Sequence, residues 1–212
     1  MVQLMADPAV SMVSATSGAT AAFRLARRTF LAGRRVEMKT LAAELDVDRT
    51  TLFRWVGNRD DLLGNVLWST AEPTWQSALA RMESPGALGV SEVMGAFVQI
   101  LIDSAPLRAF VRAEPERSLR LLTTRASILQ RQVVQAVERL LKQEEDRGNL
   151  RHPLDNHDLA YLIIRIAESF IYNDIITGEE PDAAKAEVAV AALLGADLSA
   201  RALRAQPAVS SG

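Results

Sequence analysis

Apolar residues recur at helical spacing along most of the chain. In residues 38–45, Met38, Leu41, Ala42 and Leu45 occupy positions i, i+3, i+4 and i+7, which form one stripe of a short helix. The same period recurs at residues 19–31, 59–82, 91–104, 106–113, 115–122, 124–147, 156–177 and 182–203. No segment alternates apolar and polar residues as a half-buried strand does, so the pattern predicts an all-α protein.

A break in the period at residues 46–48 separates two short helices. Aspartate tolerates the left-handed conformation that a tight turn requires, and Asp48 is a good N-cap because its carboxylate can accept from first-turn N–H groups. The next helix, residues 49–55, turns Leu52 inward, and a further helix begins at Arg59. Two short helices joined by a four-residue turn predict a helix-turn-helix, whose second helix enters the DNA major groove.

The outward face of residues 49–55 is basic and aromatic and contains no acid. A solvated helix face is the ordinary alternative, but exposed aromatic rings, and an arginine placed against the helix dipole at position 59, favour DNA binding. The residues expected to contact DNA are Lys39, Arg49, Thr50, Thr51, Phe53, Arg54, Trp55 and Arg59. Bases or nearby phosphates are expected to meet Arg49, Thr50, Thr51 and Arg54, and the others are expected to meet the backbone and sugar.

Residues 38–63 resemble the N-terminal domain of TetR-family transcriptional regulators. The family's Ile-Ala-type pair, Gly-Val-Ser turn, Thr-Leu-Tyr run and Ser-Lys-Glu helix start correspond to Leu41-Ala42, Asp46-Val47-Asp48, Thr51-Leu52-Phe53 and Asn58-Arg59-Asp60. The sequence departs from the family at Phe53, which lacks a phosphate-binding hydroxyl, at Asp46 in place of a glycine, at Val56 in place of a phenylalanine, and at Met38-Lys39 in place of a threonine. These departures affect individual contacts rather than the fold.

The resemblance implies a homodimer that pairs through its last two long helices and binds a palindromic operator. Segment 156–177 is apolar nearly all round and therefore must be covered on every side. The cover is either a second copy of the chain or, as the alternative, neighbouring helices of the same chain. A dimer would place two recognition helices at the two halves of a palindromic site.

The resemblance also implies a small hydrophobic effector bound in the helical body. The residues expected to line its site are Trp68, Trp75, Phe97, Leu101, Phe110, Arg165, Glu168 and Phe170. Each aromatic residue has the alternative of being plain core. Because charges on an apolar helix must be paired, Arg165 and Glu168 are a mutual salt bridge, a dimer contact or polar anchors of the site.

Charge is unevenly distributed between the two expected domains. Residues 18–70 carry nine Lys and Arg against six Asp and Glu, whereas the rest of the chain carries 15 against 20. A basic N-terminal module on an acidic body is expected when only one end meets phosphate. We therefore expect a mobile arm over residues 1–17, a helix-turn-helix domain over 18–64, a helical effector-binding and dimerisation domain over 65–205, and a tail over 206–212.

Several other functions lack the residues that they need. The chain has no cysteine, and His152 and His157 are wrongly spaced for one helix face, so we expect no metal and no cofactor. No convergent acid–base set is apparent, so we expect that the protein is not an enzyme. No apolar run suggests a membrane span or a secretory signal, so we expect a cytoplasmic protein. The residues favour a DNA-binding regulator, and the resemblance implies a repressor that responds to a ligand. The alternative is a helical protein-interaction or small-molecule-binding module that does not bind DNA.

Overall fold

The computed structural model describes residues 17–124 and 127–197. Within these ranges the chain forms helices and no strand, which confirms the all-α prediction. The expected tail, nearly all of the expected arm and the end of the expected last helix lie outside the described residues. The described chain divides into two compact units, and each is treated by itself below.

The first unit comprises residues up to Glu72 together with Ser104–Gln132, so it includes a segment beyond the expected domain 18–64. Its helices are α2 (Ser17–Leu31), α3 (Met38–Glu44), α4 (Arg49–Val56), the first part of α5 (Arg59–Leu79), α7 (Ala105–Ala113) and α8 (Pro115–Thr123). The second unit contains the rest of α5, α6 (Gly86–Asp103), most of α9 (Ile128–Asp146), α10 (Asn156–Ile171), α11 (Asn173–Ile176) and α12 (Ala183–Leu193).

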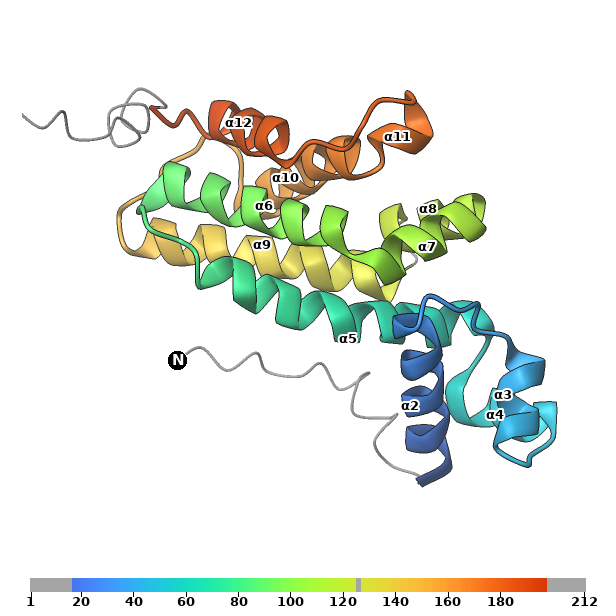
Figure 1. The fold of residues 1–212 in the computed structure, drawn as a ribbon. Helices are drawn as coiled ribbons and strands as arrows, with labels where there is room; N and C mark the ends of the chain where they lie inside the picture. Colours follow the sequence, from blue (N-terminus) through green and yellow to red (C-terminus); the bar gives the residue numbers. More distant parts are fainter. Residues whose placement is uncertain (1–16, 125–126, 198–212) are drawn as a thin grey trace, which may run out of the picture. The chain divides into compact units, whose positions relative to one another are not determined.

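Helices α2, α3 and α4 pack against one another (Figure 1). The buried residues of this cluster include Ala22, Ala26, Phe30, Leu41, Ala42, Leu52 and Val56. Trp55 is half-buried and lies on the backbone of α2, because a Cβ atom added at Gly18 would stand 2.5 Å from the Cζ2 atom of the indole. The glycine therefore allows the close approach of α4 to α2.

The turn between α3 and α4 has the conformation that its aspartates predict. Asp46 has a φ angle of 52°, in the left-handed region that few residue types tolerate. Asp48 caps α4, since its carboxylate accepts from the Thr51 N–H at 2.7 Å and from the Thr51 hydroxyl at 3.0 Å. These hydrogen bonds lower the pKa of Asp48. Both local predictions are confirmed.

One buried carboxylate, that of Glu114, joins three parts of the first unit. Arg59 donates to both of its oxygens at 2.6 Å, and the Arg59 Nε also donates to the backbone carbonyl of Val36. Arg117 approaches the same carboxylate at 3.2 Å and Arg35 at 3.6 Å. The hydrogen bonds from Arg59 lower the pKa of Glu114 and raise that of the guanidinium, against the opposing effect of burial.

The second unit is built on contacts among α6, α10 and α12 (Figure 1). Its core includes Val93, Met94, Phe97, Leu159, Ile163, Ala186 and Val190. Burial disfavours ionisation of Glu144, yet hydrogen bonds from the Gly86 N–H, Asn149 and Arg147 together lower its pKa. By length and composition α6 could cross a membrane, but half of its apolar window is buried in the protein, as in a core helix.

Several helix boundaries differ from those that the sequence predicts. Helix α5 ends at Leu79 rather than near residue 82, and α12 ends at Leu193, shortly before the left-handed Gly195, rather than near residue 203. Helix α9 begins at Ile128 rather than at residue 124, because Thr124 has an extended backbone that ends α8. Helix α6 begins at Gly86 rather than at residue 91. The segment 156–177 is interrupted at Tyr172, whose side chain is buried, and continues as the single turn α11. Nothing in the local sequence explains that interruption.

The buried ion pair gives a prediction about stability. In the Arg59→Ala variant, Glu114 is left in a nearly solvent-free site without its main partner, which costs about 3 kcal/mol in the free energy of unfolding. Urea denaturation followed by circular dichroism measures this loss. The matched control is Arg49→Ala, which removes an exposed arginine and should change the free energy of unfolding by less than about 0.5 kcal/mol.

The same pair gives a pH dependence. The pKa of Glu114 in the folded state lies below its ordinary value of 4.5, so its stabilising effect is present above that value and is lost as the pH falls through the lowered pKa. Glu114→Gln should therefore lose less stability than the wild type when the pH is lowered from 5 toward 3. Equal acid sensitivity in the two proteins would contradict this role for the carboxylate.

Candidate nucleic-acid interface

The outward face of α4 presents four of the predicted DNA contacts to solvent. Arg49, Thr50, Phe53 and Arg54 are all exposed, and Phe53 is 58% exposed although it is a large apolar residue. The opposite face of the same helix buries Leu52 and Val56 in the unit. The eight residues of α4 are thus divided into an anchoring face and a free face, and the free face carries no acid.

Two other predicted contacts on α4 are partly engaged within the protein. The hydroxyl of Thr51 donates to the capping Asp48, which leaves its methyl group and its remaining lone pairs for other contacts. Trp55 is half-buried against α2. Both side chains therefore help to fix the orientation of α4, a role that sequence reasoning did not assign to them.

The remaining two predicted contacts lie outside α4 and differ from each other. Lys39 is exposed near the start of α3. The side chain of Arg59 is only 11% exposed, and its guanidinium is occupied by Glu114 and by the Val36 carbonyl. The hydrogen bond from Arg59 to the Val36 carbonyl joins the two ends of the segment that contains α3 and α4. Its buried partner lies 55 positions further along the chain, so no local sequence signal could have revealed this role.

The residues expected to line an effector site are distributed among several separate contacts. Trp75 and Phe97 form an edge-to-face pair in the second unit, with ring centroids 5.4 Å apart. Phe110 forms a similar pair with Phe30 in the first unit at 6.0 Å, next to a void of about 20 Å³ that is too small for an effector. Trp68 is buried, and Leu101 and Phe170 are half-buried.

Of the three interpretations of Arg165 and Glu168, the salt bridge is present. The two side chains meet at 2.7 Å on α10, and the guanidinium of Arg165 lies 5.1 Å from the ring centroid of Tyr161. The histidines that could have suggested a metal site lie apart from each other. His152 contacts the Leu193 carbonyl and His157 contacts Glu138. The described residues contain no group of His, Cys, Asp and Glu suited to a metal ion.

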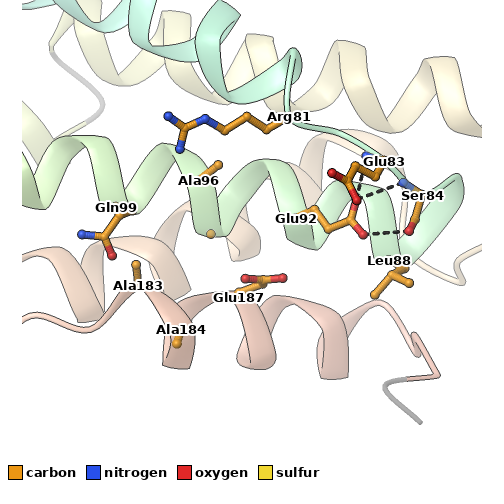
Figure 2. Close-up of a pocket in the computed structure, with 11 residues that line it drawn as sticks. Arg81, Glu83, Ser84, Leu88, Glu92, Ala96, Gln99, Ala183, Ala184 and Glu187 are labelled. Atoms are coloured by element: carbon orange, nitrogen blue, oxygen red, sulfur yellow. Dashed lines mark hydrogen bonds between the residues drawn. The ribbon is translucent and has the colours of Figure 1, made fainter. Parts of the chain in front are cut away.

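A pocket that the sequence did not indicate lies between α6, α12 and the segment that precedes α6 (Figure 2). Its volume is about 560 Å³, and its walls include small residues of both helices, among them Gly95, Ala96, Ala183 and Ala184. At one end Glu92 accepts from the N–H groups of Glu83 and Ser84 and from the Ser84 hydroxyl (Figure 2). The pocket contains none of the expected effector residues, and its acids and Arg81 make its rim polar.

The comparisons with known proteins agree with the resemblance seen in the sequence. A family model described as the C-terminal domain of tetracyclin repressor-like proteins matches residues 85–195. Among solved structures, the R. erythropolis transcriptional repressor QsdR from the TetR family is 30% identical, with a TM-score of 0.77 over 82% of this chain and 93% of that chain. No curated protein matches. The family match covers more than half of the chain, and the chain therefore belongs to the TetR family of transcriptional regulators.

Proposed function

We propose that this protein is a repressor that binds a palindromic DNA operator as a homodimer through α4, and that a small hydrophobic effector releases it. The observation that carries the proposal is the free face of α4, where Arg49 and Arg54 stand with the Thr50 hydroxyl and an exposed phenylalanine. Arginine can pair with both guanine acceptors, and a phenyl ring can contact the methyl group of thymine. The family to which the chain belongs consists of transcriptional regulators, which supports this role over an enzymatic one.

The contacts that hold the α3–α4 segment support the proposal. Base recognition requires that the reading helix be held in one orientation by contacts that do not themselves face the DNA. Here the cap at Asp48, the indole of Trp55 and the bonds of Arg59 all act from within the protein. Lys39 remains exposed and suited to a phosphate contact. We leave Arg59 out of the proposed DNA contacts because its side chain is only 11% exposed and its Nε, Nη1 and Nη2 atoms already donate to Val36 and Glu114.

The surfaces of α10 and α12 support dimerisation. Helix α10 buries Leu159 and Ile163 within its own unit but leaves Tyr161 and Leu162 exposed, at 50% and 37%. Helix α12, which packs beside it, leaves Val188 49% exposed. Exposed apolar residues on two adjacent helices favour an interface with a second copy, where aromatic and aliphatic side chains lose their contact with water.

Membership of the TetR family is the main support for a small-molecule effector. The segment that matches the family's C-terminal domain contains Phe97, Leu101 and Phe170, and α5 carries Trp75 just before it. An apolar ligand that separated Trp75 from Phe97 would find aromatic surface on both sides. Such a ligand could weaken operator binding only by its difference in affinity between the bound and released conformations.

The first test concerns the DNA contacts. Operator fragments are selected from a random pool with the wild-type protein, and their affinity for Arg49→Ala and Arg54→Ala is measured by fluorescence anisotropy. We expect each change to weaken binding by about 5- to 150-fold, the effect of losing roughly 1–3 kcal/mol at a base contact. Affinity for all sequences should also fall steeply with salt, because phosphate contacts release counterions.

The control for this test is Arg139→Ala, which removes an exposed arginine from α9 in the second unit and should leave the affinity unchanged. If both α4 variants bind the selected fragments as tightly as the wild type, α4 is not the reading helix. A wild-type protein that enriches no sequence from the pool at low salt would contradict DNA binding itself.

The second test concerns the dimer. Leu162→Asp and Val188→Asp each place a charge in the proposed interface, and we expect them to produce monomers in sedimentation velocity while circular dichroism remains helical. Ile163 is unsuitable for this purpose because its side chain is fully buried in its own unit. Leu31→Asp, at an exposed position at the end of α2, is the matched control and should remain a dimer. Dimers in both interface variants would refute the assignment to α10 and α12.

A further inference from the structure

A second pocket lies within the first unit, between the first turns of α5, helix α8 and the start of α9. Its volume is about 310 Å³, at the lower end of the range for small-molecule sites. Gly64, Leu121 and Ile128 supply apolar surface, and charged side chains supply the rim. Ile128 packs directly on the α5 backbone, since a Cβ atom added at Gly64 would lie 3.0 Å from its Cγ2 atom. None of these residues belongs to the expected effector site.

Ser127, which lines this pocket, has a buried hydroxyl that finds no hydrogen-bond partner among residues 17–124 and 127–197. The residue is only 6% exposed and stands immediately before α9, where a serine side chain ordinarily caps the N–H groups of the first turn. Its backbone is engaged, with the N–H donating to the Thr124 carbonyl at 3.0 Å, but its Oγ makes no capping bond. A buried hydroxyl left unpaired is unfavourable, so this group is suited to pair with a molecule in the pocket.

The charges around the pocket balance one another. Asp60 is held by Arg117 and Arg120, and Asp61 accepts from the Asn58 N–H at 3.1 Å. The lining residues include two acids and two arginines, Arg120 and Arg131, so their formal charges cancel. A charged ligand would find no excess of opposite charge there, whereas an uncharged one would lose little solvation on entry.

We propose that this pocket binds a small uncharged molecule with an apolar body and an oxygen that accepts a hydrogen bond from the Ser127 hydroxyl. The apolar body would lie against Leu121 and Ile128. An acceptor is favoured over a donor because Ser127 stands immediately before α9, and the first N–H groups of a helix have no intrahelical partners. The site lies in the unit that contains α4 but does not depend on DNA binding, and its test uses no DNA.

The test compares three probes of equal chain length on the full-length protein labelled with ¹³C at the methyl groups of leucine and isoleucine. The probes are 2-hexanone, hexanoate and hexylammonium, which carry a neutral, an anionic and a cationic head group. We expect 2-hexanone to shift the methyl resonances of Leu121 and Ile128 at lower concentration than the two charged probes. Tighter binding of either charged probe at these methyl groups, or no shift with any of the three, would overturn the proposal.

The role of Ser127 is tested with Ser127→Ala, which should weaken binding of 2-hexanone by about 3- to 10-fold, as expected for one neutral hydrogen bond. The matched control is Ser118→Ala, which alters a buried serine of the same unit whose hydroxyl already donates to the Pro115 carbonyl. It should bind the ketone as the wild type does. Equal affinity of Ser127→Ala and the wild type would show that the hydroxyl does not hold the ligand.

A second readout does not require a ligand. Because the hydroxyl of Ser127 has no partner in the part of the chain that the structure describes, replacing it by hydrogen in Ser127→Ala should leave Tm unchanged or raise it by a few degrees. A lower Tm for Ser127→Ala would mean that the hydroxyl already makes a stabilising bond, and it would remove the basis of the proposal.

Discussion

The arrangement of the first unit depends on one buried carboxylate. Glu114 stands between α7 and α8 and holds Arg59 at the start of α5, and Arg59 in turn holds the carbonyl of Val36 just before α3. The two ends of the segment that contains α3 and α4 are therefore tied to the same ion pair. Desolvating the charges is costly, and the pair is stable only because its geometry is bidentate and further arginines surround it.

This constraint explains how so short a helix can be held in place. Helix α4 has eight residues, too few to be stable alone in water, and it buries only Leu52 and Val56 completely. The cap at Asp48, the packing of Trp55 on Gly18 and the bonds of Arg59 supply the remaining constraints from outside its apolar stripe. The outward side chains are consequently not needed for folding and can be used for contacts with another molecule.

Features that arise from neighbours in sequence were predictable. The left-handed Asp46, the cap at Asp48 and the inward Leu52 follow from the chemistry of three or four consecutive residues, and all three are present. The structural role of Arg59 was not predictable, because an arginine at a helix start has the same local signature whether it meets a phosphate or a distant glutamate. Its partner Glu114 is brought to it only by the tertiary fold.

The contacts of the buried aromatic residues were likewise not predictable from the local sequence. A large ring on the inward face of a helix is expected to be buried, but the sequence does not tell whether it meets another ring or a cavity. Phe97 pairs with Trp75 and Phe110 pairs with Phe30, so two of the residues expected to line one site lie in different units. The pocket at Gly95 and Ala183 and the pocket beside Gly64 are instead lined by small, aliphatic and polar residues, and neither lining includes an aromatic residue.

The aromatic pairs and the pocket walls of this protein are expected to tolerate substitution differently. Because protein interiors are close-packed, a cavity persists only where contacts elsewhere hold its walls apart. A substitution that enlarges a small wall residue removes volume directly, whereas a change in an aromatic pair alters the whole unit. Ligand preference in the described part of this chain is therefore expected to change most readily through its glycines, alanines and serines, with the aromatic core and the Glu114 ion pair left intact.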